Sequence, residues 1–204
     1  MRYCLFCLLF IVCACNEKQP KQKIVLTQND SAIKGIQTAD LILRRGRDQV
    51  SDFFARLNTR NQTYSHCGLA VQTDSGVYVY HIMATLNHIE GKILCEPIDS
   101  FIDSKINSRW AIIRYNLDSI KQSHLLAKVQ DYITQKITFD QQFNLQSDDK
   151  MYCSEMLYKA FLFASKDAQI IPITIAHSGK KYIAIDNLFE HKHCKTIGEI
   201  AYKQ

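Results

Sequence analysis

The chain has 204 residues, and 47% of them are hydrophobic, which is enough for a folded core and excludes an intrinsically disordered protein. Its formal net charge is +5, from 25 Lys and Arg against 20 Asp and Glu. A small excess spread along the sequence is typical of a solvated surface, so the composition does not predict a nucleic-acid partner.

The first fifteen residues have the pattern of a bacterial export signal. Arg2 is followed by an apolar run over 5–12 that is too short to span a bilayer, which needs about 20 apolar residues. The residues before and including Cys15 resemble a lipobox, in which the last cysteine receives a diacylglycerol; an ordinary cleaved signal is the alternative. We expect a signal over 1–15, a polar tether over 16–23 and one domain over 24–204, at the cell envelope and held in the membrane by lipidated Cys15.

Of the eight cysteines, four lie in the expected domain: Cys67, Cys95, Cys153 and Cys194. An exported protein can form disulfides, and Cys95 with Cys194 is the pair that we would test first. The sequence does not give the distance between them, so whether they pair stays open.

Apolar periodicity and turn residues predict the elements in chain order. A short strand over 40–43 precedes an amphipathic helix over 49–60, whose apolar residues are Val50, Phe53, Phe54 and Leu57. Strands over 66–71 and 77–83 flank a turn signal and should pair antiparallel. Four further elements complete an α+β domain: a short helix over 99–104, a strand over 109–115, and helices over 119–136 and 153–164.

Cys153 opens the last of these helices, and the residues at +3, +4, +7 and +8 from it are apolar. Its side chain therefore points toward whatever this helix packs against. The first turn of a helix has unpaired backbone N–H groups that favour an anion, which are conditions that produce a reactive thiolate. A small buried cysteine that fills the core is the alternative, and the helix alone does not distinguish the two.

Two histidines lie on the strands that should pair. Because side chains alternate along a strand, His66 shares a face with Gly68 and Ala70, which leave room for a substrate. His81 lies on the next strand, and antiparallel pairing can bring it beside His66. A helix laid on that face would present Cys153 to His66, which gives a nucleophile, a base and an orienting group. Histidines satisfied within the core are the alternative.

The motifs around these residues resemble the YiiX-like branch of the NlpC-type cysteine hydrolases. The resemblance covers 35–163 and is carried by five segments: Ala39-Asp40-Leu41-Ile42-Leu43, Tyr64-Ser65-His66-Cys67-Gly68-Leu69, Val79-Tyr80-His81, Phe139-Asp140-Gln141-Gln142-Phe143 and Met151-Tyr152-Cys153-Ser154-Glu155-Met156. It implies a circularly permuted papain-like fold, an antiparallel sheet or small barrel packed against helices. It also implies Cys153 as nucleophile, His66 as general base and His81 as orienting residue. Ala39 stands where that branch usually has glycine.

The chemistry that this set of residues supports is acyl transfer without a cofactor. Cys153 would attack an amide carbonyl and form a thioester, with His66 moving the proton. The expected substrate is a small-molecule, peptide or cell-wall amide. The alternatives are a lipid acyl hydrolase or acyltransferase of the lecithin–retinol acyltransferase type, and a non-catalytic, lipid-anchored binding module.

Other polar residues are secondary candidates. Tyr152 and Asp140 could line the substrate pocket. The alternative role of Tyr152 is packing in the core, and that of Asp140 is to cap a helix or stabilise a turn. Glu155 should stabilise the start of its helix. His191 to Cys194 has metal-ligand residue types, but adjacent residues do not converge easily on one ion, so we expect a surface turn and no metal site.

Overall fold

A computed structural model of the protein describes residues 28–85 and 88–203. The expected export signal, the lipidation site Cys15 and the polar tether lie outside the described residues. Within the described part of the chain, no helix is both long enough and apolar enough to cross a membrane.

The core of the fold is a curled sheet in which eight strands follow the order β10-β5-β1-β2-β3-β4-β6-β7. Neighbouring strands are antiparallel except β6 and β7, which are parallel. The bounds are β1 Leu41–Gly46, β2 His66–Thr73, β3 Gly76–Thr85, β4 His88–Pro97, β5 Asn107–Tyr115, β6 Thr138–Phe139, β7 Lys150–Met151 and β10 Cys194–Ala201. A separate two-stranded ribbon pairs β8 Thr174–Ile175 with β9 Lys181–Tyr182.

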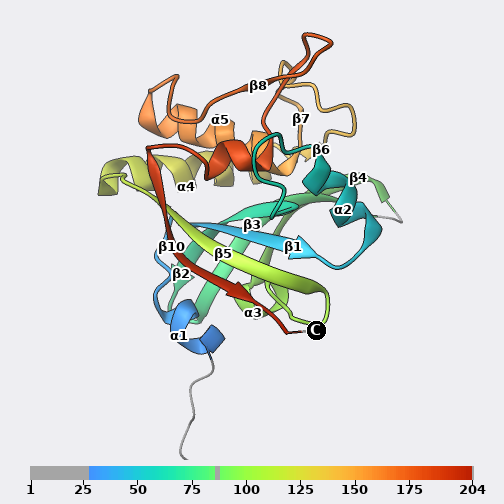
Figure 1. The fold of residues 1–204 in the computed structure, drawn as a ribbon. Helices are drawn as coiled ribbons and strands as arrows, with labels where there is room; N and C mark the ends of the chain where they lie inside the picture. Colours follow the sequence, from blue (N-terminus) through green and yellow to red (C-terminus); the bar gives the residue numbers. More distant parts are fainter. Residues whose placement is uncertain (1–27, 86–87, 204) are drawn as a thin grey trace, which may run out of the picture.

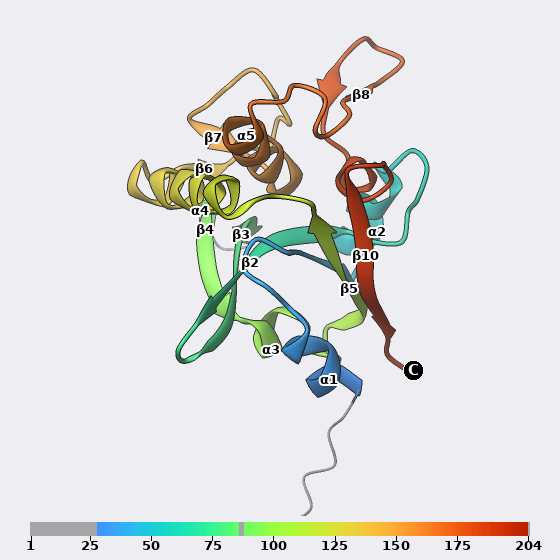
Figure 2. The same cartoon turned by 90° about the vertical axis from the view of Figure 1, so that its left-hand side faces the viewer.

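Helices cover both faces of the sheet. Figures 1 and 2 show α4 and α5 above the sheet, and α1 and α3 below it. The bounds are α1 Gln28–Lys34, α2 Gln49–Arg56, α3 Ile98–Phe101, α4 Ser119–Thr134, α5 Cys153–Ser165 and the 3₁₀-helix η1 Ile185–Leu188. The predicted α+β class and the predicted packing of a sheet against helices are confirmed.

Strand alternation divides the core into two apolar clusters. Cys67 and Leu69 of β2 belong to the larger cluster, which contains the apolar faces of α4 and α5. Ala70 of β2 and Val79 of β3 belong to the smaller cluster on the other face, around Phe101 of α3. β2 therefore buries both of its faces, since period-two alternation sends successive side chains to opposite sides.

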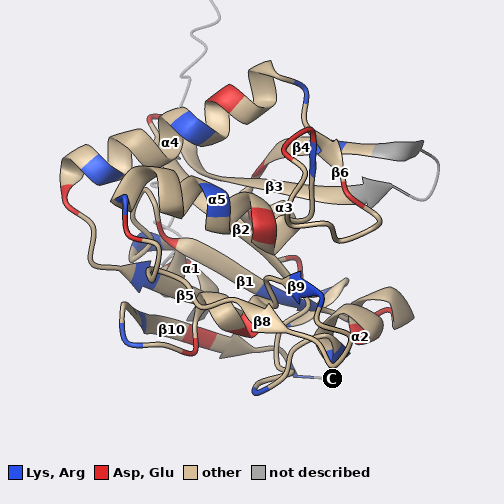
Figure 3. Cartoon of the chain, turned by 90° about the horizontal axis from the view of Figure 1, so that it is seen from above, with Lys and Arg blue, Asp and Glu red and all other residues tan. Residues whose placement is uncertain are grey.

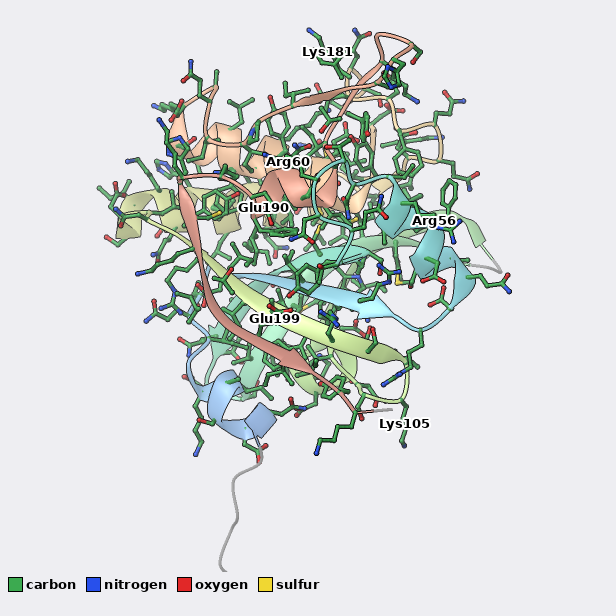
Figure 4. All side chains as sticks on the ribbon, viewed as in Figure 1. Arg56, Arg60, Lys105, Lys181, Glu190 and Glu199 are labelled. Atoms are coloured by element: carbon green, nitrogen blue, oxygen red, sulfur yellow. The ribbon has the colours of Figure 1, made fainter. Side chains whose placement is uncertain are left out.

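The expected strands and helices are present, but the sequence did not predict β4, β10, α1, the short strands β6 to β9 or η1. The helix expected over 49–60 is shorter, because it ends at Arg56 and the backbone amides of Thr59, Arg60 and Asn61 donate to the carboxylate of Asp186 instead. Arg60 lies beside Glu190 (Figure 4) and donates to its carbonyl oxygen.

Two side-chain predictions for the helices were wrong. The apolar spacing predicts that Phe53 of α2 and Ile120 of α4 are buried, but 58% of the Phe53 surface and 67% of the Ile120 surface are exposed. Ala55 of α2 and Tyr132 of α4 are buried instead. α2 therefore packs with a face rotated from the one that the apolar spacing indicated, whereas α4 buries Leu125 and Val129 as that spacing predicts.

Ala39 occupies a backbone position that favours glycine. Its φ is 73°, in the left-handed region where a Cβ is costly, and its amide donates to the carbonyl of Ala70. Ala39, which stands where the resembling branch usually has glycine, therefore carries backbone strain just before β1.

Cys95 and Cys194 do not form a disulfide in this structure. All four cysteines of the described residues are free thiols. Cys95 lies on β4 and Cys194 on β10, and β3, β2, β1 and β5 separate these two strands in the sheet. That spacing is far beyond disulfide reach, because neighbouring strands are about 4.8 Å apart.

The charged side chains are mixed in sign. Figure 3 shows Lys, Arg, Asp and Glu interspersed over α4, α5 and the strands on the viewed side. This distribution agrees with the solvated surface expected from composition.

Replacing Asp186 should destabilise the fold. Its buried carboxylate accepts three backbone N–H groups from residues 59–61, at 2.6 to 3.2 Å. We expect Asp186→Ala to lower the free energy of unfolding by about 2–4 kcal/mol, because three buried donors lose a charged acceptor. Urea denaturation measures this, with Asp52→Ala, an exposed carboxylate, as the control. Equal midpoints for the two variants would show that the loop does not depend on Asp186.

Candidate active site

His66 and His81 lie side by side, as predicted. His66 is the first residue of β2, His81 lies on the adjacent strand β3, and His66 Nε2 is 2.9 Å from His81 Nδ1. The two rings meet edge to face, and the ring of Phe101 packs against both. His81 has no exposed surface. The pair is therefore held rigidly by the smaller apolar cluster.

Glu96, which was not predicted from the sequence, extends this pair into a chain of three groups. His81 Nε2 is 2.9 Å from Glu96 Oε1, and the Glu96 side chain is 30% exposed. Glu96 lies on β4 two residues beyond Leu94, the cross-strand partner of His81, so the two side chains share a face. The hydrogen bond from His81 holds the pKa of Glu96 below its usual value, so this carboxylate is ionised at neutral pH.

The order of these groups fixes where the imidazole protons lie. A carboxylate only accepts hydrogen bonds, so the 2.9 Å contact between His81 Nε2 and Glu96 Oε1 favours a proton on that nitrogen. In neutral His81 the other nitrogen, Nδ1, is then an acceptor, so His66 Nε2 must carry the proton that joins the two rings. His66 Nδ1 is left unprotonated, with a lone pair that can accept a proton. This is the form of histidine that a general base requires.

The environment keeps both imidazoles neutral. Burial lowers the pKa of His66 well below 6.5, and the nearby charges of Arg44 and His81 add to that effect. Burial also lowers the pKa of His81, although the hydrogen bond with Glu96 opposes the shift. His66 therefore remains available as a base at pH values where an exposed histidine would be protonated.

Cys153 begins α5, as predicted, but the helix does not lie on the histidine face of the sheet. It packs over the opposite face, where the Cys67 side chain points. The expectation that α5 covers His66 directly was wrong, because β2 buries both faces and its histidine face is filled by α3. Cys153 instead lies near the end of β2, close enough to Cys67 for that thiol to lower its pKa.

The surroundings of Cys153 favour its thiolate. The hydrogen bond from Cys67 is the largest influence that lowers the pKa of Cys153, burial opposes it, and the backbone amides of Ser154, Cys67 and Cys153 also lower it. Two of these amides belong to the first turn of α5, as the predicted helix-start effect requires. Burial raises the pKa of Cys67 itself well above 9, so Cys67 stays a thiol and a donor.

Cys153 and His66 line the same cavity, which has a volume of about 450 Å³. Tyr152 is also on its wall, and its hydroxyl oxygen accepts a hydrogen bond from the amide of Ile183 at 2.7 Å. The cavity opens around the end of β2, so residues from both faces of the sheet reach it. The nucleophile and base candidates therefore face one space large enough for a small-molecule ligand.

Asp140 does not line this cavity. Its buried carboxylate accepts hydrogen bonds from the amides of Gln142 and Asn144, so it holds the turn that carries Phe143 onto the cavity wall. Glu155 has the predicted role at the helix start, since its Oε2 accepts from the amide of Tyr152 at 3.3 Å. Burial raises the pKa of Glu155 to about 7, and Lys159 lies 2.9 Å from it.

The segment that contains His191 and Cys194 has a local structural role. His191 Nε2 lies 2.9 Å from the hydroxyl of Tyr115, and Cys194 begins β10. Burial raises the pKa of Cys194 to about 11, which makes it a poor nucleophile beside Cys153. Among residues 28–85 and 88–203, no three His, Cys, Asp or Glu side chains are grouped so that they could hold a metal ion.

The fold and this site together define a cysteine hydrolase of the papain-like class, with the histidine strand before the cysteine helix. The chain belongs to the family of permuted papain-like amidase enzymes, YaeF/YiiX, C92 family, whose model matches residues 35–193. It is accordingly a cysteine amidase or peptidase-like hydrolase.

A solved structure has the same fold. The protein described as metalloprotein yiiX from Escherichia coli O157:H7 superposes with a TM-score of 0.64 at 18% identity, over 81% of this chain and 98% of that one. At this identity the likeness concerns the fold alone. The curated proteins contain no match to this chain.

Removing the thiol of Cys67 should raise the pKa of Cys153. We expect Cys67→Ala to move the pH profile of Cys153 alkylation to higher pH, because the thiolate loses its strongest donor. The rate is measured by quantifying the modified peptide that contains Cys153 by mass spectrometry. Cys95→Ala, which removes an exposed thiol on β4, is the matched control. Superimposable profiles for the two variants would contradict this assignment.

Proposed function

We propose that this chain is an envelope-anchored cysteine hydrolase that cleaves an amide bond through a thioester on Cys153. The supporting observation is a cavity lined by Cys153 at a helix start and by His66, whose protonation is fixed by His81 and Glu96. The anchor at Cys15 is part of the proposal and rests on the lipobox-like sequence.

His66 supplies the proton transfers of the proposed reaction. Its free Nδ1 accepts the thiol proton of Cys153, and the resulting imidazolium protonates the leaving amine as the tetrahedral intermediate collapses to the thioester. Water, deprotonated by the same nitrogen, then hydrolyses the thioester and releases the acid. His81 and Glu96 stabilise the transient imidazolium, because the ionised carboxylate lies at the end of the hydrogen-bonded chain.

The oxyanion of the intermediate requires donors beside Cys153. The backbone N–H of Cys153 in the first turn of α5 is one such donor, since helix starts leave their first amides unpaired. Arg44 adds a positive charge near the sulfur, and its guanidinium is held by the carbonyl of Phe101 at 2.9 Å and by the Phe101 ring. The developing negative charge therefore meets fixed partners.

A thiol-labelling experiment tests the proposal. The purified protein is treated with a limiting iodoacetamide probe at pH 6, and label on the Cys153 peptide is compared for wild type and His66→Ala. We expect at least a tenfold loss in the variant, in line with the range of about 10²–10⁴ for general-base catalysis. Wild type should react faster than the variant at this pH, because burial keeps His66 neutral and able to take the thiol proton, and the pKa of Cys153 is lowered.

Cys153→Ala is the control that shows which label is on Cys153. This variant should also fail to hydrolyse the amide substrate. Slow labelling shared equally by all cysteines, with no dependence on His66, would instead favour a binding module without catalysis.

Glu96→Gln should impair turnover without changing substrate binding. A glutamine amide both donates and accepts, so it no longer requires His81 Nε2 to carry the proton, and the tautomer of His66 is no longer fixed. We expect kcat to fall by about tenfold or more with KM nearly unchanged. Glu199→Gln, at an exposed glutamate paired with Arg109, is the control. A kcat equal to that of wild type would remove Glu96 from the mechanism.

A further inference from the structure

Two cysteines lie together where the start of α5 meets the start of β2. Cys67 is the second residue of β2 and belongs to the larger apolar cluster, and Cys153 is the first residue of α5 and packs against that cluster. Cys67 lies close enough to Cys153 for both its thiol and its backbone amide to lower the pKa of Cys153. Two neighbouring thiols are the arrangement from which a disulfide forms.

The two thiols differ in what can reach them. Cys153 lines the cavity of about 450 Å³ that it shares with His66, so a small solute that enters the cavity meets its sulfur. Cys67 has no exposed surface, because its side chain points into the apolar cluster on the other face of β2. A dissolved oxidant therefore reacts with Cys153, and Cys67 is oxidised only through Cys153.

Cys153 also has more thiolate character than the other cysteines in the described part of the chain. Peroxides oxidise the thiolate form of cysteine, so a lowered pKa makes a cysteine the preferred target. Burial raises the pKa of Cys95 and raises that of Cys194 to about 11, whereas the pKa of Cys153 is lowered. The sulfur that an oxidant can reach through the cavity is therefore also the most reactive of these four.

We propose that Cys67 is a resolving cysteine, so that Cys153 and Cys67 form a reversible disulfide when the protein meets hydrogen peroxide. The Cys153 thiolate attacks one peroxide oxygen, the O–O bond breaks, hydroxide leaves, and the sulfur becomes a sulfenic acid. The sulfur of Cys67 then attacks the sulfur of Cys153, the S–O bond breaks, and the oxygen leaves as water with the proton of Cys67. Two thiols are oxidised, and one peroxide is reduced to two waters.

The first step makes the second easier. Burial and the adjacent Cys153 thiolate both raise the pKa of Cys67 before oxidation. A neutral sulfenic acid replaces that negative charge, so the Cys67 thiol loses its proton more readily once Cys153 has become an electrophile. The disulfide occupies the nucleophile and stops acyl transfer. A small thiol that enters the cavity and attacks the Cys153 sulfur restores both cysteines.

Peptide mapping without reduction tests this assignment and needs no substrate. The protein is treated with excess hydrogen peroxide, the remaining thiols are alkylated with iodoacetamide, and tryptic peptides are identified by mass spectrometry. Trypsin places Cys67 on the peptide 61–92 and Cys153 on the peptide 151–159, with no other cysteine on either. We expect these two peptides to be joined in the wild type. Dithiothreitol should separate them and restore iodoacetamide labelling of Cys153.

Cys67→Ala removes the resolving thiol, so Cys153 should be oxidised further to a sulfinic acid, and dithiothreitol should no longer restore its labelling. Cys95→Ala, which removes an exposed thiol on β4, is the matched control and should recover as the wild type does.

The joined peptides in the wild type decide the question without any variant. Wild-type Cys153 that becomes a sulfinic acid with no link to Cys67 would overturn the proposal, and so would full recovery of labelling in Cys67→Ala. Neither result bears on the dependence of Cys153 labelling on His66, which tests the proposed function separately.

Discussion

The row of close polar contacts from Glu96 through His81 to His66 is the constraint on which the site depends. An ionised carboxylate at one end sets the proton of each imidazole in turn, and the last nitrogen in the chain is left without one. His81 has no exposed surface, so water does not compete for its ring nitrogens. A neutral imidazole alone would orient His66 weakly; a carboxylate behind it supplies the charge that stabilises an imidazolium.

This chain and the cysteine approach the cavity from different faces of one sheet. The histidines belong to the face covered by α3, whereas α5 packs on the face that contains Cys67. They can line one cavity because His66 is the first residue of β2 and Cys153 the first residue of α5, so each lies at the end of its element. Cys67, adjacent to His66 in sequence but on the other face, contacts the sulfur of Cys153 for the same reason.

Local sequence patterns were sufficient for much of this arrangement. The turn at Asp74 to Gly76 and strand alternation placed His66 beside His81, and apolar spacing placed Cys153 at a helix start. Glu96 was missed because β4 was not recognised as a strand, and its contact with His81 depends on the register of that pair. The face of the sheet on which α5 packs was predicted wrongly, because α3 occupies the histidine face and α5 therefore packs on the other one. Period-two alternation does not contain that information when a strand is buried on both faces.

The protonation of the two imidazoles is the most direct test of the account. Long-range ¹H–¹⁵N correlation spectra of the protein labelled with ¹⁵N-histidine, assigned with His66→Ala and His81→Ala variants, distinguish the two tautomers of each ring. At pH 7 we expect both His66 and His81 to be neutral and protonated on Nε2, with Nδ1 of His66 unprotonated. A His66 ring protonated on Nδ1, or doubly protonated at that pH, would contradict it.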